Sequence, residues 1–114
     1  MDLTSFLQKI KEQPSSIDFE QTMAVIDTNY EFSATEFRNG SVINGAGENN
    51  GSCKIFAFAK MNALDVESTL ACFGRFYRED VLKNPAGNDH QNIRNFMELG
   101  WDGIQYTGVA LVAK

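Results

Sequence analysis

The sequence is poor in the residues that make covalent cross-links and metal sites. It has two cysteines and one histidine in 114 residues. One cysteine pair is no disulfide framework, and no cysteine–histidine spacing matches a zinc site. Cys53 and Cys72 both stand among apolar residues, so we expect reduced, buried thiols. We predict no metal site and no cofactor.

Long hydrophobic runs and surplus positive charge are also absent. No apolar run approaches the ~20 residues of a transmembrane helix. The amino-terminal segment "MDLTSFLQKIKEQP" lacks the basic region, apolar stretch and cleavage site of a secretory signal peptide. The net charge of −5 disfavours non-specific binding to nucleic acid or anionic membranes. We therefore expect no nucleic-acid partner, no membrane insertion, and a cytoplasmic location or secretion without a cleaved signal peptide.

The remaining composition is that of an ordinary globular protein. Hydrophobic residues make up 43% of the chain, charged residues 22%, and there are nine phenylalanines. This length and composition predict a single domain over residues 1–114 with an aromatic-rich core.

Helical periodicity occurs in five segments. The first ends before Pro14, and Ser15 or Ser16 can cap the second. Residues 52–64 are ambiguous between helix and buried strand, but their alanines favour a helix. Residues 65–84 form the clearest helix, and the fifth helix begins at Asn88 or Asp89 with Gln91 in a capping box.

Strand patterns flank these helices. Alternating apolar and polar residues from Tyr30 predict a strand that ends at the Asn39-Gly40 turn. A short return through Val42 and Ile43 completes a hairpin near residues 30–44, and a closing strand near residues 104–112 pairs with it. The fold class is therefore α+β, with about five helices packed on a small antiparallel sheet.

Two motifs suggest chemistry. The glycine-rich loop at residues 44–51, followed by Lys54, could cradle an anion, but its spacing does not match a P-loop and a flexible turn is the commoner role. Cys53 at a helix start, with His90 as its base, is the candidate catalytic pair of a hydrolase or transferase. The residues around Cys53 do not match papain-like proteases, so enzyme activity is not the favoured interpretation.

The segment from Asn84 to Trp101 is rich in polar side chains. His90 lies beside the apolar stripe of its helix, where histidine usually bonds a carbonyl or a carboxylate. Arg75–Glu79 and Arg94–Glu98 have the i, i+4 spacing of ion pairs on solvated helix faces. The polar residues exceed what one helix start requires, which indicates a binding surface. Its candidate residues are Tyr77, Arg78, His90, Asn92, Arg94 and Trp101.

Four segments together resemble a known family. They are "YEFSATEFRNG", "NGAGENNGSCKIFAFAK", "STLACFGRFYREDVLKNP" and "GNDHQNIRNFMELGWDGI", between residues 30 and 104. They resemble the HopJ family of type III effector proteins, named after proteins that plant-associated bacteria deliver into host cells. The resemblance implies a bacterial protein and a host-cell partner. It carries over no catalytic residues, because the family has no agreed enzymatic activity.

Three hypotheses follow for the function. The favoured one is an interaction protein that binds a host partner, and it requires an exposed patch near Tyr77, Arg78 and Arg94. An enzyme that uses Cys53 and His90 requires those two side chains to be close. A cytoplasmic protein that binds a small polar ligand requires a pocket lined by phenylalanines and a few convergent polar groups.

Overall fold

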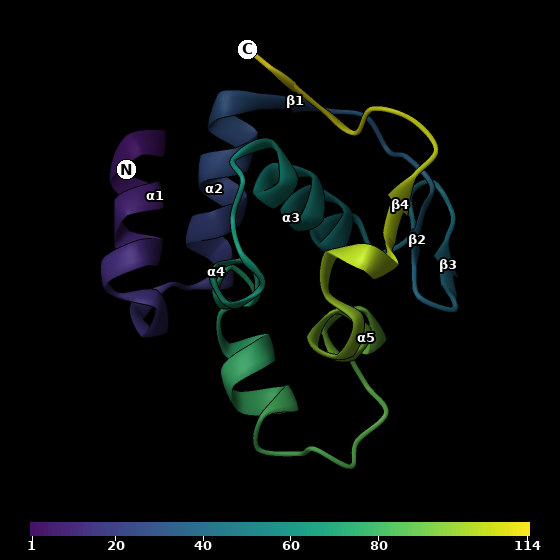
Figure 1. Ribbon diagram of the computed structural model, residues 1–114. Coiled ribbons are helices and arrows are strands. Elements are labelled where there is room, and N and C mark those ends of the chain that lie inside the picture. The colour runs from purple at the N-terminus through teal and green to yellow at the C-terminus, as the bar shows by residue number, and fades with distance from the viewer.

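Helices form most of the molecule, and short strands lie along one side of it (Figure 1). The computed structural model describes residues 1–114. The α-helices are α1 (Leu3–Glu12), α2 (Phe19–Asn29), α3 (Asn50–Met61), α4 (Val66–Ala71) and α5 (Gln91–Leu99). The strands are β1 (Tyr30–Phe32), β2 (Phe37–Asn39), β3 (Val42–Asn44), β4 (Ile104–Tyr106) and β5 (Leu111–Ala113). Three shorter helical turns are η1 (Pro14–Ser16), η2 (Phe76–Val81) and η3 (Gly100–Gly103). The predicted α+β class is confirmed.

The strands form two small antiparallel sheets where a single sheet was predicted. One sheet pairs β1 with β5, and the other has the order β3-β2-β4. The hairpin itself is β2–β3, shorter than the predicted hairpin near residues 30–44. Ser33 N–H donates to Ala110 O at 2.8 Å and Thr107 N–H to Glu36 O at 3.2 Å, so the two sheets share one register. Between β1 and β2, at residues 33–36, the alternation of buried and exposed residues stops, and the ladder of strand hydrogen bonds is interrupted there.

Two helix boundaries differ from the prediction. Asp18 caps α2 in a capping box with Gln21, because the Pro14–Ser16 segment forms the separate turn η1. The helix predicted over residues 65–84 divides into α4 and the π-helical turn η2, separated by Gly74. Gly74 has a φ of +59°, and a Cβ there would lie 2.6 Å from the backbone nitrogen of Phe19. Glycine at this position therefore allows the chain to turn between α4 and η2 and to approach the start of α2 closely.

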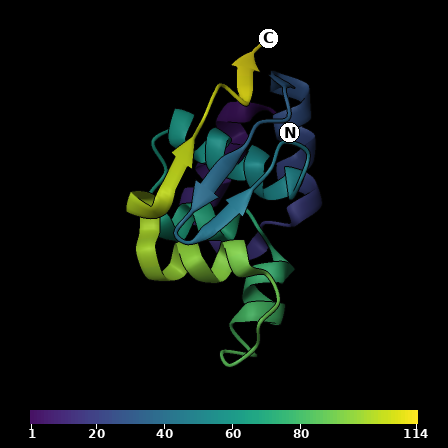
Figure 2. The ribbon, with the colours of Figure 1, turned by 90° about the vertical axis from the view of Figure 1, so that its right-hand side faces the viewer.

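Helix α3 runs through the core. The Phe56 ring lies 5.5 Å from the Phe73 ring and 4.9 Å from the Phe96 ring, and it contacts Phe37 and Trp101 at their edges. In Figure 2 the strands lie in front of this teal helix, and the yellow-green helix α5 crosses below them. None of the helices combines the length and the apolar character needed to cross a bilayer. The core thus fixes α3 between the strands on one side and α4 and α5 on the other.

Candidate functional site

A cleft of about 390 Å³ opens where α2, α3, η2 and α5 meet. One part of its lining is aromatic and consists of Phe19, Phe73 and Phe76. The polar part consists of Asn49, Ser52, His90, Gln91 and Asn92, and the remaining lining residues are Val42, Gly51 and Ile93. The polar residues come from the starts of α3 and α5, which are far apart in the sequence.

The starts of α3 and α5 share an uncommon geometry. Their N-cap residues, Asn49 and His90, are both left-handed, with φ of 51° and 50°, and neither side chain caps its own helix. The prediction that Asn88 or Asp89 caps α5 is therefore wrong; Gln91 instead donates to Asn88 O at 2.6 Å. The first backbone N–H groups of both helices, including those of Ser52 and Gln91, have no hydrogen-bond partner in the protein. Unpaired N–H groups at helix starts are ready donors to a ligand oxygen or to water.

A buried asparagine joins these two helix starts. Asn44 Oδ1 accepts hydrogen bonds from Asn49 Nδ2 at 2.7 Å and from Asn92 Nδ2 at 2.9 Å. Asn92 Oδ1 in turn accepts from Asn44 Nδ2 and from Asn39 Nδ2, each at 3.1 Å. Asn39, Asn44 and Asn92 are all buried, and Asn39 Oδ1 has no partner. We name these four residues the amide network; it ties the β2–β3 hairpin to both polar sides of the cleft.

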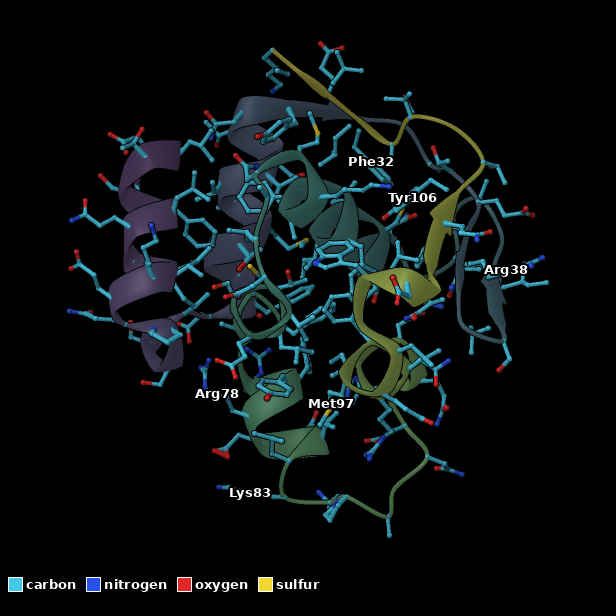
Figure 3. The ribbon with its side chains drawn as sticks, viewed as in Figure 1. Phe32, Arg38, Arg78, Lys83, Met97 and Tyr106 are labelled. Carbon is cyan, nitrogen blue, oxygen red and sulfur yellow. The ribbon has the colours of Figure 1, made fainter.

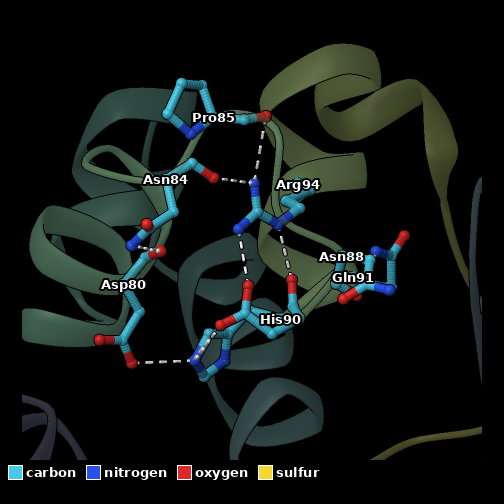
Figure 4. Close-up of polar contacts among 8 residues, drawn as sticks. Asp80, Asn84, Pro85, Asn88, His90, Gln91 and Arg94 are labelled. Carbon is cyan, nitrogen blue, oxygen red and sulfur yellow. Dashed lines mark hydrogen bonds and ion pairs between the residues drawn. The ribbon is translucent and has the colours of Figure 1, made fainter.

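His90 is held at the edge of the cleft by an acidic residue from η2. Its Nε2 lies 3.0 Å from Asp80 Oδ2 and 3.9 Å from Asp89 Oδ2 (Figure 4). The imidazole also packs on the Phe76 ring, with centroids 5.3 Å apart. The sequence led us to expect a carbonyl or a carboxylate as the partner of this histidine, and the structure has a carboxylate.

Arg94 is a brace for the loop that precedes α5. Its guanidinium donates to Asp89 O and Asp89 Oδ1, each at 2.6 Å, and to Asn84 O at 2.9 Å (Figure 4). The hydrogen bond from Arg94 keeps the pKa of the Asp89 carboxyl below its ordinary value. The predicted Arg94–Glu98 pair is absent, and Arg75 likewise binds Glu20 at 2.8 Å instead of Glu79. Arg94 thus binds acceptors of the loop before α5 and not the acidic residue four positions later on its helix. The i, i+4 spacing rule considers only residues of one helix, so it does not predict this partner.

The six predicted binding residues do not form one surface. His90 and Asn92 line the cleft. Arg78 donates to Ile17 O at 2.8 Å, and Trp101 donates to Leu64 O at 3.1 Å, so both polar groups are engaged within the fold. Tyr77 is partly buried against the core. Phe19, Phe73 and Phe76 also line the cleft, but their spacing in the sequence is the same as that of core residues and did not mark them as cleft residues.

Cys53 lies outside the cleft lining. Its thiol is buried and lies 3.5 Å from Thr35 O, with no hydrogen bond to His90. Burial raises the pKa of the Cys53 thiol, and complete burial raises the pKa of Cys72 to about 12. A nucleophilic cysteine needs the opposite shift. Lys54, the residue expected beside the glycine-rich loop, pairs with Asp27 at 2.8 Å.

The fold and the cleft together define a small α+β protein with a ligand-sized cleft at the junction of two helix starts. The family model described as "HopJ type III effector protein" matches residues 3–111. A crystal structure described as that of "unknown function protein VPA0580" is 62% identical, with a TM-score of 0.98, and the match covers all of this chain and 95% of the other. No curated protein is significantly similar. The chain belongs to the HopJ type III effector family.

Removing the side chain of Asn44 should destabilise the protein markedly. Asn44→Ala leaves the buried side-chain amide of Asn92 without its acceptor and also removes the acceptor of the exposed Asn49, so we expect a loss of about 2–4 kcal/mol in the free energy of unfolding. Urea unfolding measures it. Ile43→Ala, one residue earlier on the same strand but exposed, should change stability by about 0.5 kcal/mol or less. Equal losses in the two variants would contradict the role of the amide network.

Removing the guanidinium of Arg94 should loosen the loop before α5. In Arg94→Ala, the carbonyl groups of Asn84 and Asp89 lose a charged donor, so the hydrogen-bonded amides of Gly87 and Ile93 should exchange about tenfold faster or more. Hydrogen-exchange mass spectrometry measures this directly. Lys83→Ala, whose ion pair with Glu79 is exposed, serves as the control and should leave the same amides unchanged.

Both thiols should react slowly in the folded protein. Burial raises the pKa of Cys53 and Cys72, so iodoacetamide at pH 8 should modify them at least about tenfold more slowly than free cysteine. Unfolding in urea should remove the difference. Mass spectrometry of the modified peptides separates the two sites. Labelling of native Cys53 at the rate of free cysteine would restore the cysteine-enzyme hypothesis.

Proposed function

We propose that this protein acts by binding a small ligand in the cleft between the starts of α3 and α5. The ligand has an apolar, ring-sized body and a polar end that accepts hydrogen bonds. The observation that carries this proposal is the division of the cleft into an aromatic part and a part rich in unpaired donors. Its volume of about 390 Å³ lies within the range of ligand pockets.

The aromatic part suits the body of such a ligand. Phe19 and Phe76 pack edge to face with ring centroids 5.0 Å apart, and both rings line the cleft, where they can contact an apolar group. Arg75 covers Phe76 from another side at 4.7 Å while its guanidinium binds Glu20. The aromatic pair is therefore fixed in place before any ligand arrives, which lowers the entropic cost of binding.

The polar part suits an oxygen acceptor. The first N–H groups of α3 and α5 have no partner in the protein, and the amide network sets the two helix starts side by side. Desolvating these donors without replacing their hydrogen bonds would be costly, so a ligand that fills the cleft must offer acceptors to them. This requirement gives the site selectivity for one end of the ligand.

The segments that carry the family resemblance meet at this cleft. Nine of the eleven lining residues belong to the segments 44–60, 68–85 and 87–104. Membership of a type III effector family adds the proposal that the protein binds its ligand inside a host cell. The rival hypothesis of a protein-binding patch loses support, because Arg78 and Arg94 use their guanidinium groups within the fold.

Benzoate and benzamide test this proposal, since each joins one aromatic ring to an oxygen acceptor. In ¹H–¹⁵N spectra, millimolar probe should shift the amides of Gly51, Ser52, Gln91 and Asn92. Phe76→Ala should weaken binding about tenfold by removing part of the aromatic wall. Arg38→Ala is the matched control, because Arg38 extends from the surface of β2 away from the cleft (Figure 3).

Two results would contradict the proposal. One is the absence of probe-dependent shifts at the cleft with either compound. The other is a set of cleft shifts that Phe76→Ala leaves unchanged while its urea midpoint shows a folded protein.

A further inference from the structure

We propose that the cleft also carries out acyl transfer, with Ser52 as the nucleophile, His90 as the base and Asp80 as the group that orients His90. This inference rests on the proposed function in that the substrate must enter the same cleft. The predicted pair of Cys53 and His90 is thereby replaced by the neighbouring serine.

Ser52 is on the side of α3 that faces the cleft. It lines the cleft, and its hydroxyl has no hydrogen-bond partner in the protein. Phe56, four residues later on the same helix face, packs against Phe73 and Phe96, so this face is directed toward α4 and α5. Cys53 is directed elsewhere, toward Thr35 O. The serine hydroxyl is therefore the nucleophilic side chain that a ligand in the cleft can reach.

His90 has the arrangement of a general base. Its Nε2 is 3.0 Å from Asp80 Oδ2, and Nδ1 has no partner in the protein. With the proton on Nε2, the ring donates to Asp80 and Nδ1 remains a free acceptor. Asp80 and the Phe76 ring fix the orientation of the imidazole. Asp80 thus has the role of the carboxylate in a nucleophile–base–carboxylate set, which is to orient the base. Ser52 and His90 line the same cleft without a direct hydrogen bond, and catalysis requires the substrate or a water molecule to join them.

The start of α3 supplies donors for the charge that develops in such a reaction. The backbone N–H groups of Gly51 and Ser52 are unpaired and belong to residues that line the cleft. In acyl transfer, negative charge forms on the former carbonyl oxygen next to the attacking atom. Donors in the same helical turn as the nucleophile are suitably placed for this oxygen.

The reaction balances with water as the only co-reactant. Ser52 Oγ attacks the carbonyl carbon of an ester, and His90 Nδ1 takes the serine proton. The bond from the carbonyl carbon to the leaving oxygen breaks, and the leaving alcohol takes that proton from His90. Water, deprotonated by His90, then attacks the acyl-serine, releases the carboxylic acid and restores Ser52. The substrate class is a small ester whose ring-sized group fits the phenylalanine side.

A fluorophosphonate probe tests the nucleophile in the full-length protein. It should attach to Ser52, as located by mass spectrometry, and Ser52→Ala should abolish the labelling. His90→Ala should slow the labelling about 100-fold, because a general base typically accelerates such a step by at least that factor. Added imidazole should restore part of the rate. Asp80→Asn should slow it as well, and Asp80→Glu should recover part of the loss, which a purely structural role would not produce. Ser15→Ala, an exposed serine in η1, should label as the unaltered protein does.

The outcomes separate this inference from the proposed function. Labelling that is absent from Ser52, or that proceeds at an unchanged rate in His90→Ala, overturns acyl transfer. If benzoate still shifts the cleft amides in that case, ligand binding stands alone. Absence of both labelling and benzoate binding removes both proposals. Hydrolysis of p-nitrophenyl acetate that disappears in Ser52→Ala, with an unchanged urea midpoint, supports the inference independently.

Discussion

The arrangement of the cleft depends on the hydrogen bonds that the carboxamide of Asn44 makes. This carboxamide joins the β2–β3 hairpin to the starts of α3 and α5, across 48 residues of sequence in the case of Asn92. A buried amide group is costly unless it is hydrogen-bonded, so each member of the network constrains the positions of the others. The hydrophobic core around Phe56 brings the elements together, but apolar contacts are not directional. The amide network supplies the direction and sets the two helix starts side by side.

This use of the polar side chains has a consequence for the cleft. Asn49 and His90 occupy the N-cap positions of α3 and α5, where a side chain would ordinarily satisfy the first N–H groups. Asn49 instead donates to Asn44, and His90 contacts Asp80. Both residues also have left-handed backbone geometry, which costs about 1 kcal/mol or more for a residue other than glycine. Because these two side chains bind other residues, they do not cap their own helices, and the first backbone N–H groups of α3 and α5 stay unpaired at the cleft.

Local patterns in the sequence predicted the elements better than the site. The apolar period of α1 and the alternation from Tyr30 depend on neighbouring residues alone, so most helices and strands could be predicted, whereas the register of the strands could not. The roles of Arg78, Arg94 and Trp101 depend on carbonyl groups from distant segments, and no spacing rule contains them. Phe19 and Phe76 were indistinguishable from core residues, because a ring beside a cleft has the same helical spacing as a ring beside other rings.

The neighbours Ser52 and Cys53 show how helix geometry decides between two chemistries. Consecutive residues on an α-helix point about 100° apart, so only one of them can face a given wall. The core fixes the rotation of α3 through Phe56, and with that rotation the thiol is buried toward Thr35 while the hydroxyl is left at the cleft. From the sequence alone, the cysteine and the single histidine were the candidate catalytic pair, although an enzyme was not the favoured interpretation. In the folded chain Ser52 and His90 line the same cleft and Cys53 does not, so the rotation of α3 selects which of the two side chains a ligand in the cleft can meet.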